Sequence, residues 1–410
     1  MSLYNQICAL KDSTTILRAT SATKRCELLH CFAQKLLDSR ESILQANAQD
    51  CMQAAHLSAA MQERLALDDK KLQALAQSVA NIANLPDPIG RVIEGYKVAS
   101  GIQIEKVSVP LGVVAIIYES RPNVTSDTAA LCLKSANGIV LKGGKESEQS
   151  NKAIIESLRA ALHAFDMPQE LVFFTSSRKA THEILQMNDC IDVVIPRGGE
   201  SLVSFVTQNS KIPVIKHDKG ICHAYVHRDA DFTKATNIVI NAKTQRPSTC
   251  NAIETLLVDV DISSDFLNVL RPKLNSKETQ IVACPRSIEH FEHATPIDSQ
   301  SYCTEYGSNC LNIRIIANLN EAIEHINHFG SHHSDVIITE NYSAAERFLA
   351  EVDSACVYVN ASTRFSDGGE FGLGAEMGIA TSKLHARGPM GLGELTTYKY
   401  LIRGNGEVRL

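Results

Sequence analysis

One cysteine of this chain stands where a thiol could do chemistry. Cys250 lies in AKTQRPSTCNAIETLLVD, after a polar loop that contains a proline and just before an apolar strand pattern. Lys243 and Arg246 are close to it in sequence. A loop thiol beside cations can have a lowered pKa, and the thiolate is the form that acts as a nucleophile. Spacing alone leaves two interpretations open, a nucleophile and an incidental loop cysteine.

The other eleven cysteines have a different context. The chain has 12 cysteines and 14 histidines, with no CxxC pair and no zinc-type spacing between the two residue types. Most of the cysteines sit beside aliphatic residues, as Cys132 does in AALCLKSA and Cys356 does in SACVYVN. We therefore expect buried free thiols in a reducing cytoplasm, and no metal site.

Two glycine pairs follow apolar strand patterns. In IVLKGGKESEQSN a strand ends in KGGK at 142–145 and a helix follows, and DVVIPRGGESLVSF repeats the arrangement at 198–199. Ligands of open α/β sheets bind at the carboxyl ends of the strands, and a glycine-rich helix start lets backbone N–H groups approach a phosphate. A solvated loop is the alternative for KGGK. The glycine pairs at 372–374 and 391–393 neither follow a strand nor open a helix, so tight turns are favoured there over a dinucleotide fingerprint.

Composition narrows the classes of protein. The chain has 410 residues, 44% of them hydrophobic and 21% charged, which excludes a disordered chain and a small disulfide scaffold. Its net charge is −6, and it has no run of five Lys or Arg, so nucleic-acid binding is not expected. It also lacks an apolar stretch of membrane-spanning length and a signal-peptide core at its start, which favours a cytoplasmic protein.

The hydrophobic pattern predicts the elements around these residues. Residues 20–83 carry apolar side chains at three- and four-residue steps, which predicts helices. Residues 92–98 and 102–109 are rich in β-forming residues and predict a hairpin. The segment 364–410 is rich in glycine and ends in a strand pattern, TTYKYLIRGNG.

Between the hairpin and this last segment, strands alternate with helices. One alternating region covers residues 112–199, and a second begins near residue 229. Such alternation is typical of parallel sheets with crossover helices. We therefore expect an α/β fold of two domains with parallel sheets and a small β-stranded appendage.

Three long motifs carry a resemblance to a known family. VPLGVVAIIYESRPNVT, QRPSTCNAIETLLV and FGLGAEMGIATSKLHARGPMGLGELTTYKY resemble the γ-glutamyl phosphate reductase branch of the aldehyde dehydrogenase superfamily, in order and over essentially the whole chain. The resemblance implies a cofactor-binding α/β domain, a catalytic α/β domain and a β-stranded oligomerisation arm. The implied boundaries are 1–94 and 110–223 with part of 361–382 for the cofactor domain, 224–360 for the catalytic domain, and 95–109 with 383–410 for the arm.

The same resemblance assigns roles to the residues above. It implies that Cys250 is the catalytic nucleophile and that Lys142 holds the adenosine ribose region. Lys145 stands where NAD-using relatives carry an acidic residue, and a lysine would attract a 2′-phosphate, so NADPH is the expected cofactor. Glu305, in TEYGSNCLNI, resembles the glutamate that binds the nicotinamide ribose, with a surface glutamate as the alternative. The full set of expected cofactor-binding residues is Lys142, Gly143, Gly144, Lys145, Gly198, Gly199 and Glu305.

Two segments depart from the hydrolytic aldehyde dehydrogenases. Where those enzymes carry a glutamate base that activates water, this chain reads IKHDKGICHAYV, with His217 or Asp218 near that place. Where they carry an asparagine for the oxyanion, it reads YESRPN, and Arg121 or Asn123 could take that catalytic role. Both departures fit an enzyme that keeps water away from a thioester.

The implied reaction is the NADPH-dependent reduction of L-glutamyl 5-phosphate to L-glutamate 5-semialdehyde through a cysteine thioester, the second step of proline biosynthesis from glutamate. The candidates for binding the substrate are Arg246, Asn360, Ser362 and Arg364, and His332, His333 and Asp335 could support the site or be surface residues. A homo-oligomer and transient contact with glutamate 5-kinase are the expected partnerships. Another aldehyde-oxidising member of the superfamily and an inert scaffold protein are the alternatives.

Overall fold

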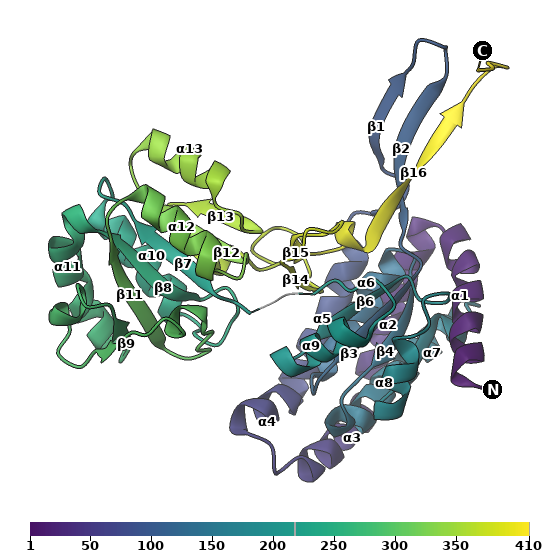
Figure 1. The fold of residues 1–410 in the computed structure, drawn as a ribbon. Coiled ribbons are helices and arrows are strands. Elements are labelled where there is room, and N and C mark those ends of the chain that lie inside the picture. Colours follow the sequence, from purple (N-terminus) through teal and green to yellow (C-terminus); the bar gives the residue numbers. More distant parts are fainter. Residues whose placement is uncertain (217–218, 410) are drawn as a thin grey trace.

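The computed structural model describes residues 1–216 and 219–409. It consists of two lobes and a β-stranded arm that extends away from them (Figure 1). The chain passes from the first lobe to the second near residue 220 and returns after residue 360. Within the described ranges, no helix has the length and apolar character needed to cross a membrane.

A four-stranded parallel sheet of order β5-β4-β3-β6 forms the centre of the first lobe. Val114 and Ile116 of β3 pack with residues of α2, α5, α6 and α7, whereas Ala115 and Ile117 pack with residues of α1, α8 and α9. Because helices cover both faces of the sheet, the strand is apolar at every position, as predicted for a buried parallel strand. The elements of this lobe are α1 (Leu3–Ala19), α2 (Ala22–Asp38), α3 (Arg40–Gln53), α4 (Ala59–Leu65), α5 (Asp69–Asn84), β3 (Val113–Tyr118), α6 (Pro122–Lys134), β4 (Gly138–Lys142), α7 (Glu148–Ala164), β5 (Val172–Thr175), α8 (Arg178–Ile184), β6 (Val193–Arg197), α9 (Glu200–Asn209), β14 (Gly378–Ala380) and β15 (Gly388–Met390).

The second lobe contains a seven-stranded parallel sheet of order β10-β9-β11-β8-β7-β12-β13. Helices α10 and α11 pack on one face of the sheet, and α12 and α13 pack on the other. The elements are β7 (Cys222–Val226), α10 (Phe232–Thr244), β8 (Ile253–Asp259), α11 (Ser263–Ser276), β9 (Gln280–Ala283), β10 (Thr295–Pro296), β11 (Cys310–Ile316), α12 (Leu319–Phe329), β12 (Ser334–Ile338), α13 (Tyr342–Glu351) and β13 (Cys356–Val359).

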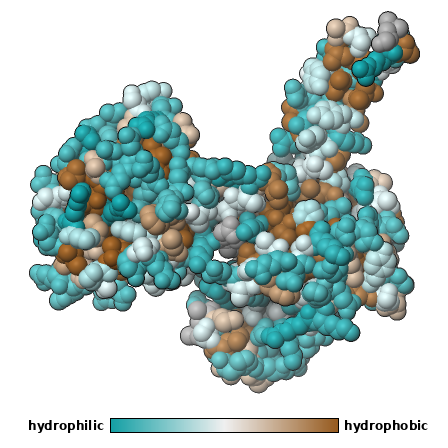
Figure 2. Space-filling view, in the orientation of Figure 1, coloured by the Kyte–Doolittle hydropathy of each residue, from teal (hydrophilic) through white to brown (hydrophobic). Residues whose placement is uncertain are grey.

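The arm is a three-stranded antiparallel sheet with β2 in the centre. Its strands are β1 (Val92–Lys97), β2 (Gln103–Pro110) and β16 (Thr396–Arg403). Hydrophobic residues run along it in Figure 2, and Tyr400 and Ile402 on the outer strand are exposed by 51% and 64%. The predicted hairpin and C-terminal strand therefore form one sheet.

The strand pairing shifts the expected domain boundaries. A boundary at residue 223 would cut β7, which belongs entirely to the second sheet. The arm begins with β1 at Val92 instead of residue 95. Residues 383–395 are not part of the arm, because Met390, Leu392 and Leu395 are buried in the core of the first lobe.

Helix α1 was not anticipated from the sequence. It places Ile7, Leu10, Thr14 and Leu17 on one buried face, and the Ser2 side chain accepts a hydrogen bond at its N-terminus. The spacing of these four residues is helical, but the polar Thr14 interrupts the apolar stripe.

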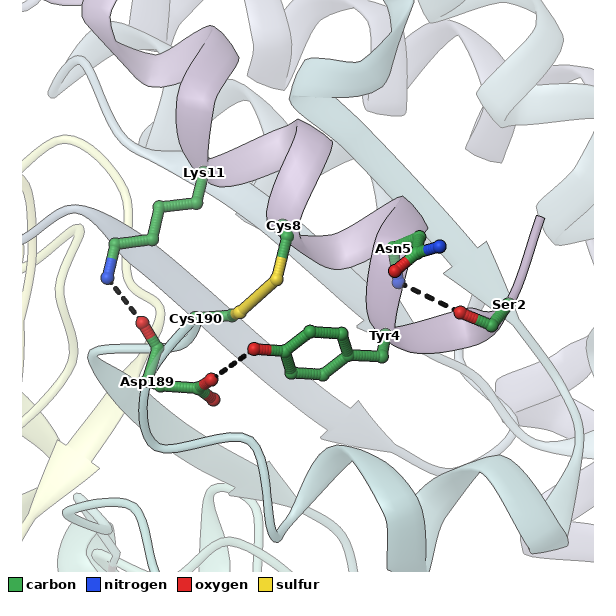
Figure 3. The surroundings of a disulfide bond; sticks show 7 residues. All are labelled: Ser2, Tyr4, Asn5, Cys8, Lys11, Asp189 and Cys190. Carbon is green, nitrogen blue, oxygen red and sulfur yellow. Dashed lines mark hydrogen bonds between the residues drawn. A yellow bond between two sulfur atoms is a disulfide. The ribbon is translucent and has the colours of Figure 1, made fainter.

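A disulfide between Cys8 and Cys190 fastens α1 to the loop that precedes β6 (Figure 3). Tyr4 and Lys11 of the same helix donate hydrogen bonds to the side chain and the carbonyl of Asp189. The expectation that all cysteines other than Cys250 are buried free thiols is therefore wrong. Ten cysteines are free, and only five of these are buried.

Candidate active site

Cys250 lies between α10 and β8, against Gly220, where the chain crosses from the first lobe to the second. The thiol of Cys222 donates a hydrogen bond to its carbonyl oxygen, with 3.2 Å between the sulfur and the oxygen. Gly220 packs against its backbone so closely that a Cβ atom on Gly220 would lie 2.5 Å from the Cys250 Cα. The backbone of Cys250 is therefore held in place by Gly220 and by Cys222, the first residue of β7.

The charge environment of this thiol differs from the sequence-based expectation. Burial raises the pKa of Cys250 to about 11; Arg197 opposes this rise, while Glu376 and Glu305 add to it. Lys243, which we expected to act on the thiol, instead forms an ion pair with Glu254 at 2.7 Å in the core. The expectation of a lowered pKa is therefore wrong for this structure, and the strongest cation near the thiol comes from the first lobe.

A cleft of about 710 Å³ opens beside the seam between the lobes. Gly198 and Gly199 line it from the first lobe, and Thr304, Glu305 and Ser331 line it from the second. The structure thus brings together three of the residues that we expected to bind the cofactor.

The glycines of this cleft fit a ligand that approaches the backbone closely. A Cβ atom on Gly198 would lie 2.7 Å from both the Glu119 carboxyl carbon and a methyl group of Leu202. The N–H of Gly199, at the start of α9, donates to a Glu119 carboxylate oxygen at 3.1 Å. An exposed helix N-terminus at the edge of a parallel sheet suits a dinucleotide phosphate, but here Glu119 already occupies part of that position.

The KGGK turn at 142–145 lies at the carboxyl end of β4, as predicted. Burial lowers the pKa of Lys142, whereas Glu146 raises it. A Cβ atom on Gly143 would lie 2.5 Å from the Asn151 amide nitrogen, and one on Gly144 would lie 2.8 Å from a Glu146 carboxylate oxygen. Lys145 is exposed and starts a short 3-10 turn, so it is free to reach a ligand.

The expected substrate-binding residues differ in the hydrogen bonds that their side chains form. Arg364 donates to the side chains of Asn251 and Gln245, next to the nucleophile, and Arg246 is exposed in the same loop. The Asn360 amide is used differently, because its oxygen accepts from the Thr339 N–H and its nitrogen donates to the Thr339 carbonyl, at 2.9 and 2.8 Å.

Ser362 also has a structural contact. It is buried, and its hydroxyl accepts from the Arg364 N–H at 3.3 Å. Asn123 is exposed on the first turn of α6, and Arg121 immediately precedes that helix. His217 and Asp218 lie outside the described residues.

Three histidines of the second lobe lie on β7 or just before β12. Asp335 accepts from the backbone N–H and the ring of His223, at 2.7 and 2.9 Å, inside the core. His333 is buried 3.6 Å from the Cys222 sulfur, and His332 faces the Asp353 carbonyl. Among the described residues there is no group of three or more His, Cys, Asp or Glu that could hold a metal ion.

Three residues near the thiol were missed in the sequence. Arg197 directly precedes the Gly198–Gly199 pair, and the position of that pair after a strand could have drawn attention to it. No local sequence pattern marks Gly220 and Cys222, because their importance depends on their contacts with the backbone of Cys250.

Two parallel α/β lobes, with a cysteine where the chain crosses between them and a glycine-lined cleft beside the seam, define an aldehyde dehydrogenase-like protein. The model of the aldehyde dehydrogenase family matches residues 5–281, and the chain belongs to this family. A gamma-glutamyl phosphate reductase from Wolinella succinogenes is 53% identical over 403 residues, which are 97% of this chain and 98% of the relative. Within the family, the chain is therefore a member of the gamma-glutamyl phosphate reductases.

Solved structures agree with this placement. The crystal structure of a gamma-glutamyl phosphate reductase from Thermotoga maritima has a TM-score of 0.97 at 41% identity and covers 99% of both chains. The corresponding protein from Saccharomyces cerevisiae is 31% identical with a TM-score of 0.55, over 100% of this chain and 99% of that one. An acetylating aldehyde dehydrogenase from Geobacillus thermoglucosidasius shares the fold at 17% identity, with a TM-score of 0.68 over 99% and 97% of the two chains.

Proposed function

We propose that this chain reduces L-glutamyl 5-phosphate to L-glutamate 5-semialdehyde with NADPH, through a thioester on Cys250, as the second step of proline biosynthesis from glutamate. The observation that carries the proposal is the near full-length similarity to gamma-glutamyl phosphate reductases together with the position of Cys250 against Gly220, where the chain crosses between the lobes.

The chemistry at the thiol is an acyl transfer. The Cys250 thiolate attacks the C5 carbonyl, the new C–S bond forms, and the C–O bond to phosphate breaks. The leaving phosphate takes up a proton, so that a thioester and hydrogen phosphate result. The oxyanion of the tetrahedral species needs preorganised donors. We assign this task to the Cys250 N–H and the Asn123 side chain.

The first lobe and the edge of the second would hold the cofactor. Gly198 and Gly199 leave room for its phosphates, Glu305 faces the same cleft, and the KGGK turn offers Lys142 and Lys145 to the adenosine end. A bound nicotinamide supplies the hydride that reduces the thioester carbonyl. The C–S bond then breaks, which releases the aldehyde and returns Cys250 as a thiolate.

Arg364 and Arg246 are the groups that we propose for the substrate carboxylate, because a guanidinium binds a carboxylate through two parallel hydrogen bonds. Ser362 and Asn360 support this side of the site from behind, since their side chains are engaged with the backbone at Arg364 and Thr339.

The decisive test runs the reaction backwards with pyrroline carboxylate, inorganic phosphate and NADP. We expect NADP reduction that requires phosphate. Oxidation of the semialdehyde to glutamate at a similar rate without phosphate would contradict the proposal and favour a hydrolytic aldehyde dehydrogenase.

The arm suggests assembly. A small isolated sheet is marginally stable in water, and a strand added to an open edge satisfies its backbone groups. We propose that the arm joins subunits of a homo-oligomer, and that the enzyme works in the cytoplasm with transient contact to a glutamate 5-kinase. Removing the residues after Thr397 should produce monomers or insoluble protein in light scattering, whereas a folded product of unchanged mass would refute the arm as an interface.

A further inference from the structure

Two arginines of the first lobe come together at the carboxyl edge of its sheet. The β3–β6 register pairs Tyr118 with Arg197, the last residue of β6. Glu119, which directly follows β3, donates its N–H to the Arg197 carbonyl at 3.2 Å. Arg121 follows two residues later and precedes α6. Strand pairing therefore places both residues at one edge of the sheet, on the side that meets the second lobe.

Within residues 1–216 and 219–409, these two guanidinium groups have no carboxylate partner. In the part of the chain that the structure describes, neither side chain forms an ion pair or a hydrogen bond. By contrast, the buried Arg25 pairs with Asp87 at 2.7 Å. Glu376 is the carboxylate that acts on Arg197, but it accepts the Gly368 N–H and is not within ion-pair distance.

The two arginines also repel each other. Burial lowers the pKa of Arg121, and Arg197 and Arg64 lower it further, whereas Glu119 and Cys250 raise it. Like charges held together without a counter-ion are stabilised by an anion that binds between them. The first turn of α6 adds to this field, because no side chain caps it and its N-terminus carries a partial positive charge.

The Cys250 thiol is close enough to this cluster to interact with both charges. Arg197 is the cation that most lowers the pKa of Cys250, and Arg121 interacts with the same thiol. An anion held by the pair would therefore lie next to the nucleophile. The dianionic phosphoryl group of an acyl phosphate has the charge and the pairs of oxygens that a planar guanidinium binds in a bidentate manner.

We propose that Arg197 and Arg121 form the subsite for the phosphoryl group of the acyl phosphate, an assignment that rests on the proposed function. In thioester formation, the pair stabilises the charge that accumulates on the departing phosphate as the C–O bond breaks. In the reverse direction, it holds hydrogen phosphate, whose oxygen attacks the thioester carbonyl. The C–S bond then breaks, Cys250 leaves as a thiolate, and the phosphate proton goes to solvent.

The cofactor is the other source of phosphate at this edge, because its pyrophosphate would approach Gly198 and Gly199, next to Arg197. Two measurements separate these sources. The first, an alkylation experiment, needs neither turnover nor cofactor. Its result therefore tests this subsite even if the proposed function is wrong.

The first measurement compares two alkylating agents at Cys250, with modification followed by peptide mass spectrometry. Iodoacetate is an anion and iodoacetamide is neutral, but both react with the same thiolate, so the ratio of their rates reports the local positive charge and not the thiolate fraction. We expect Arg197→Gln and Arg121→Gln each to lower this ratio about threefold to tenfold, since each removes one charge-assisted contact. Arg286→Gln, an exposed arginine after β9, is the matched control and should not change it.

Added inorganic phosphate should slow iodoacetate more than iodoacetamide in the unaltered enzyme, and this protection should weaken in the two variants. An unchanged rate ratio and unchanged phosphate protection in both variants would overturn the subsite.

The second measurement uses the reverse assay. For Arg197→Gln we expect the KM for phosphate to rise about tenfold or more, while the Kd for NADPH, measured by its fluorescence, changes less than about twofold. A weakened NADPH affinity with an unchanged KM for phosphate would assign the pair to the cofactor and refute the proposal.

Discussion

The two lobes differ in whether the ionisable side chains near the seam have partners. In the second lobe, Lys243 is paired with Glu254 at 2.7 Å and His223 with Asp335 at 2.9 Å, all four of them buried. At the sheet edge of the first lobe, the guanidinium of Arg197 has no ion-pair partner among the residues that the structure describes. A buried charge is costly unless it is paired. The second lobe therefore uses its charges to hold its own fold, whereas the first lobe presents a cation to a ligand.

The sharpest test of this difference between the lobes removes the proposed nucleophile, Cys250. Cys250→Ala should abolish phosphate-dependent NADP reduction, while NADPH binding survives on the first lobe. The neighbouring thiol of Cys222 should not replace it, because Cys222 is fully buried and burial raises its pKa well above the ordinary value. Initial rates and NADPH fluorescence measure the two effects. Turnover that persists in the variant would remove Cys250 from the mechanism, and Cys132→Val serves as a buried-thiol control with unchanged chemistry.

Breaking the buried pair should have the next largest effect. Lys243→Met leaves Glu254 without its partner in the core, which should lower the free energy of unfolding by about 3–5 kcal/mol. Hydrogen exchange in β8 under increasing urea measures it. The double variant Lys243→Met/Glu254→Leu should recover most of the loss. A single variant as stable as the unaltered protein would show that this pair contributes nothing.

The raised pKa of the thiol predicts a pH dependence. In the ligand-free enzyme, the thiolate fraction of a group with a pKa of about 11 grows with pH throughout the range below that value. Alkylation of Cys250 by iodoacetamide should therefore rise about tenfold per unit between about pH 7 and 9. Arg197→Gln should slow it at every pH in this range, since Arg197 favours the thiolate. A plateau near neutral pH would contradict the raised pKa.

The cofactor preference should change least. Lys145→Glu replaces a cation that we expect to meet the 2′-phosphate with an anion, so the ratio of kcat/KM for NADPH over NADH should fall about tenfold. Lys152→Glu, on the same surface within α7, is the charge-matched control. If the ratio keeps its original value, Lys145 does not contact the 2′-phosphate.

The sequence predicted what depends on local pattern. The apolar run of β3, the hairpin that became β1 and β2, and the turns at 142–145 and 198–199 are all where the pattern placed them. Helix α1 was missed, because Thr14 interrupts its apolar stripe.

The errors at the site have another origin. Lys243 is close to Cys250 in sequence, but it points into the core toward Glu254, and the cation that acts on the thiol arrives from the other lobe as Arg197. Proximity in sequence does not show in which direction a side chain points. The disulfide between Cys8 and Cys190, in turn, joins residues that are 182 positions apart in the sequence. Contacts of this range are set by the topology of the sheet, which a local pattern does not contain.

The fastening of α1 has a consequence for how the chain is made. Its buried face packs on strands β3 and β4, and its disulfide partner is Cys190. During synthesis, this helix leaves the ribosome before the strands and the loop that it packs on. Its disulfide partner follows 182 residues later. Such long-range closure is slow. The earliest part of the first lobe to be made is thus among the last to be completed, and its apolar stripe has to be shielded in the meantime.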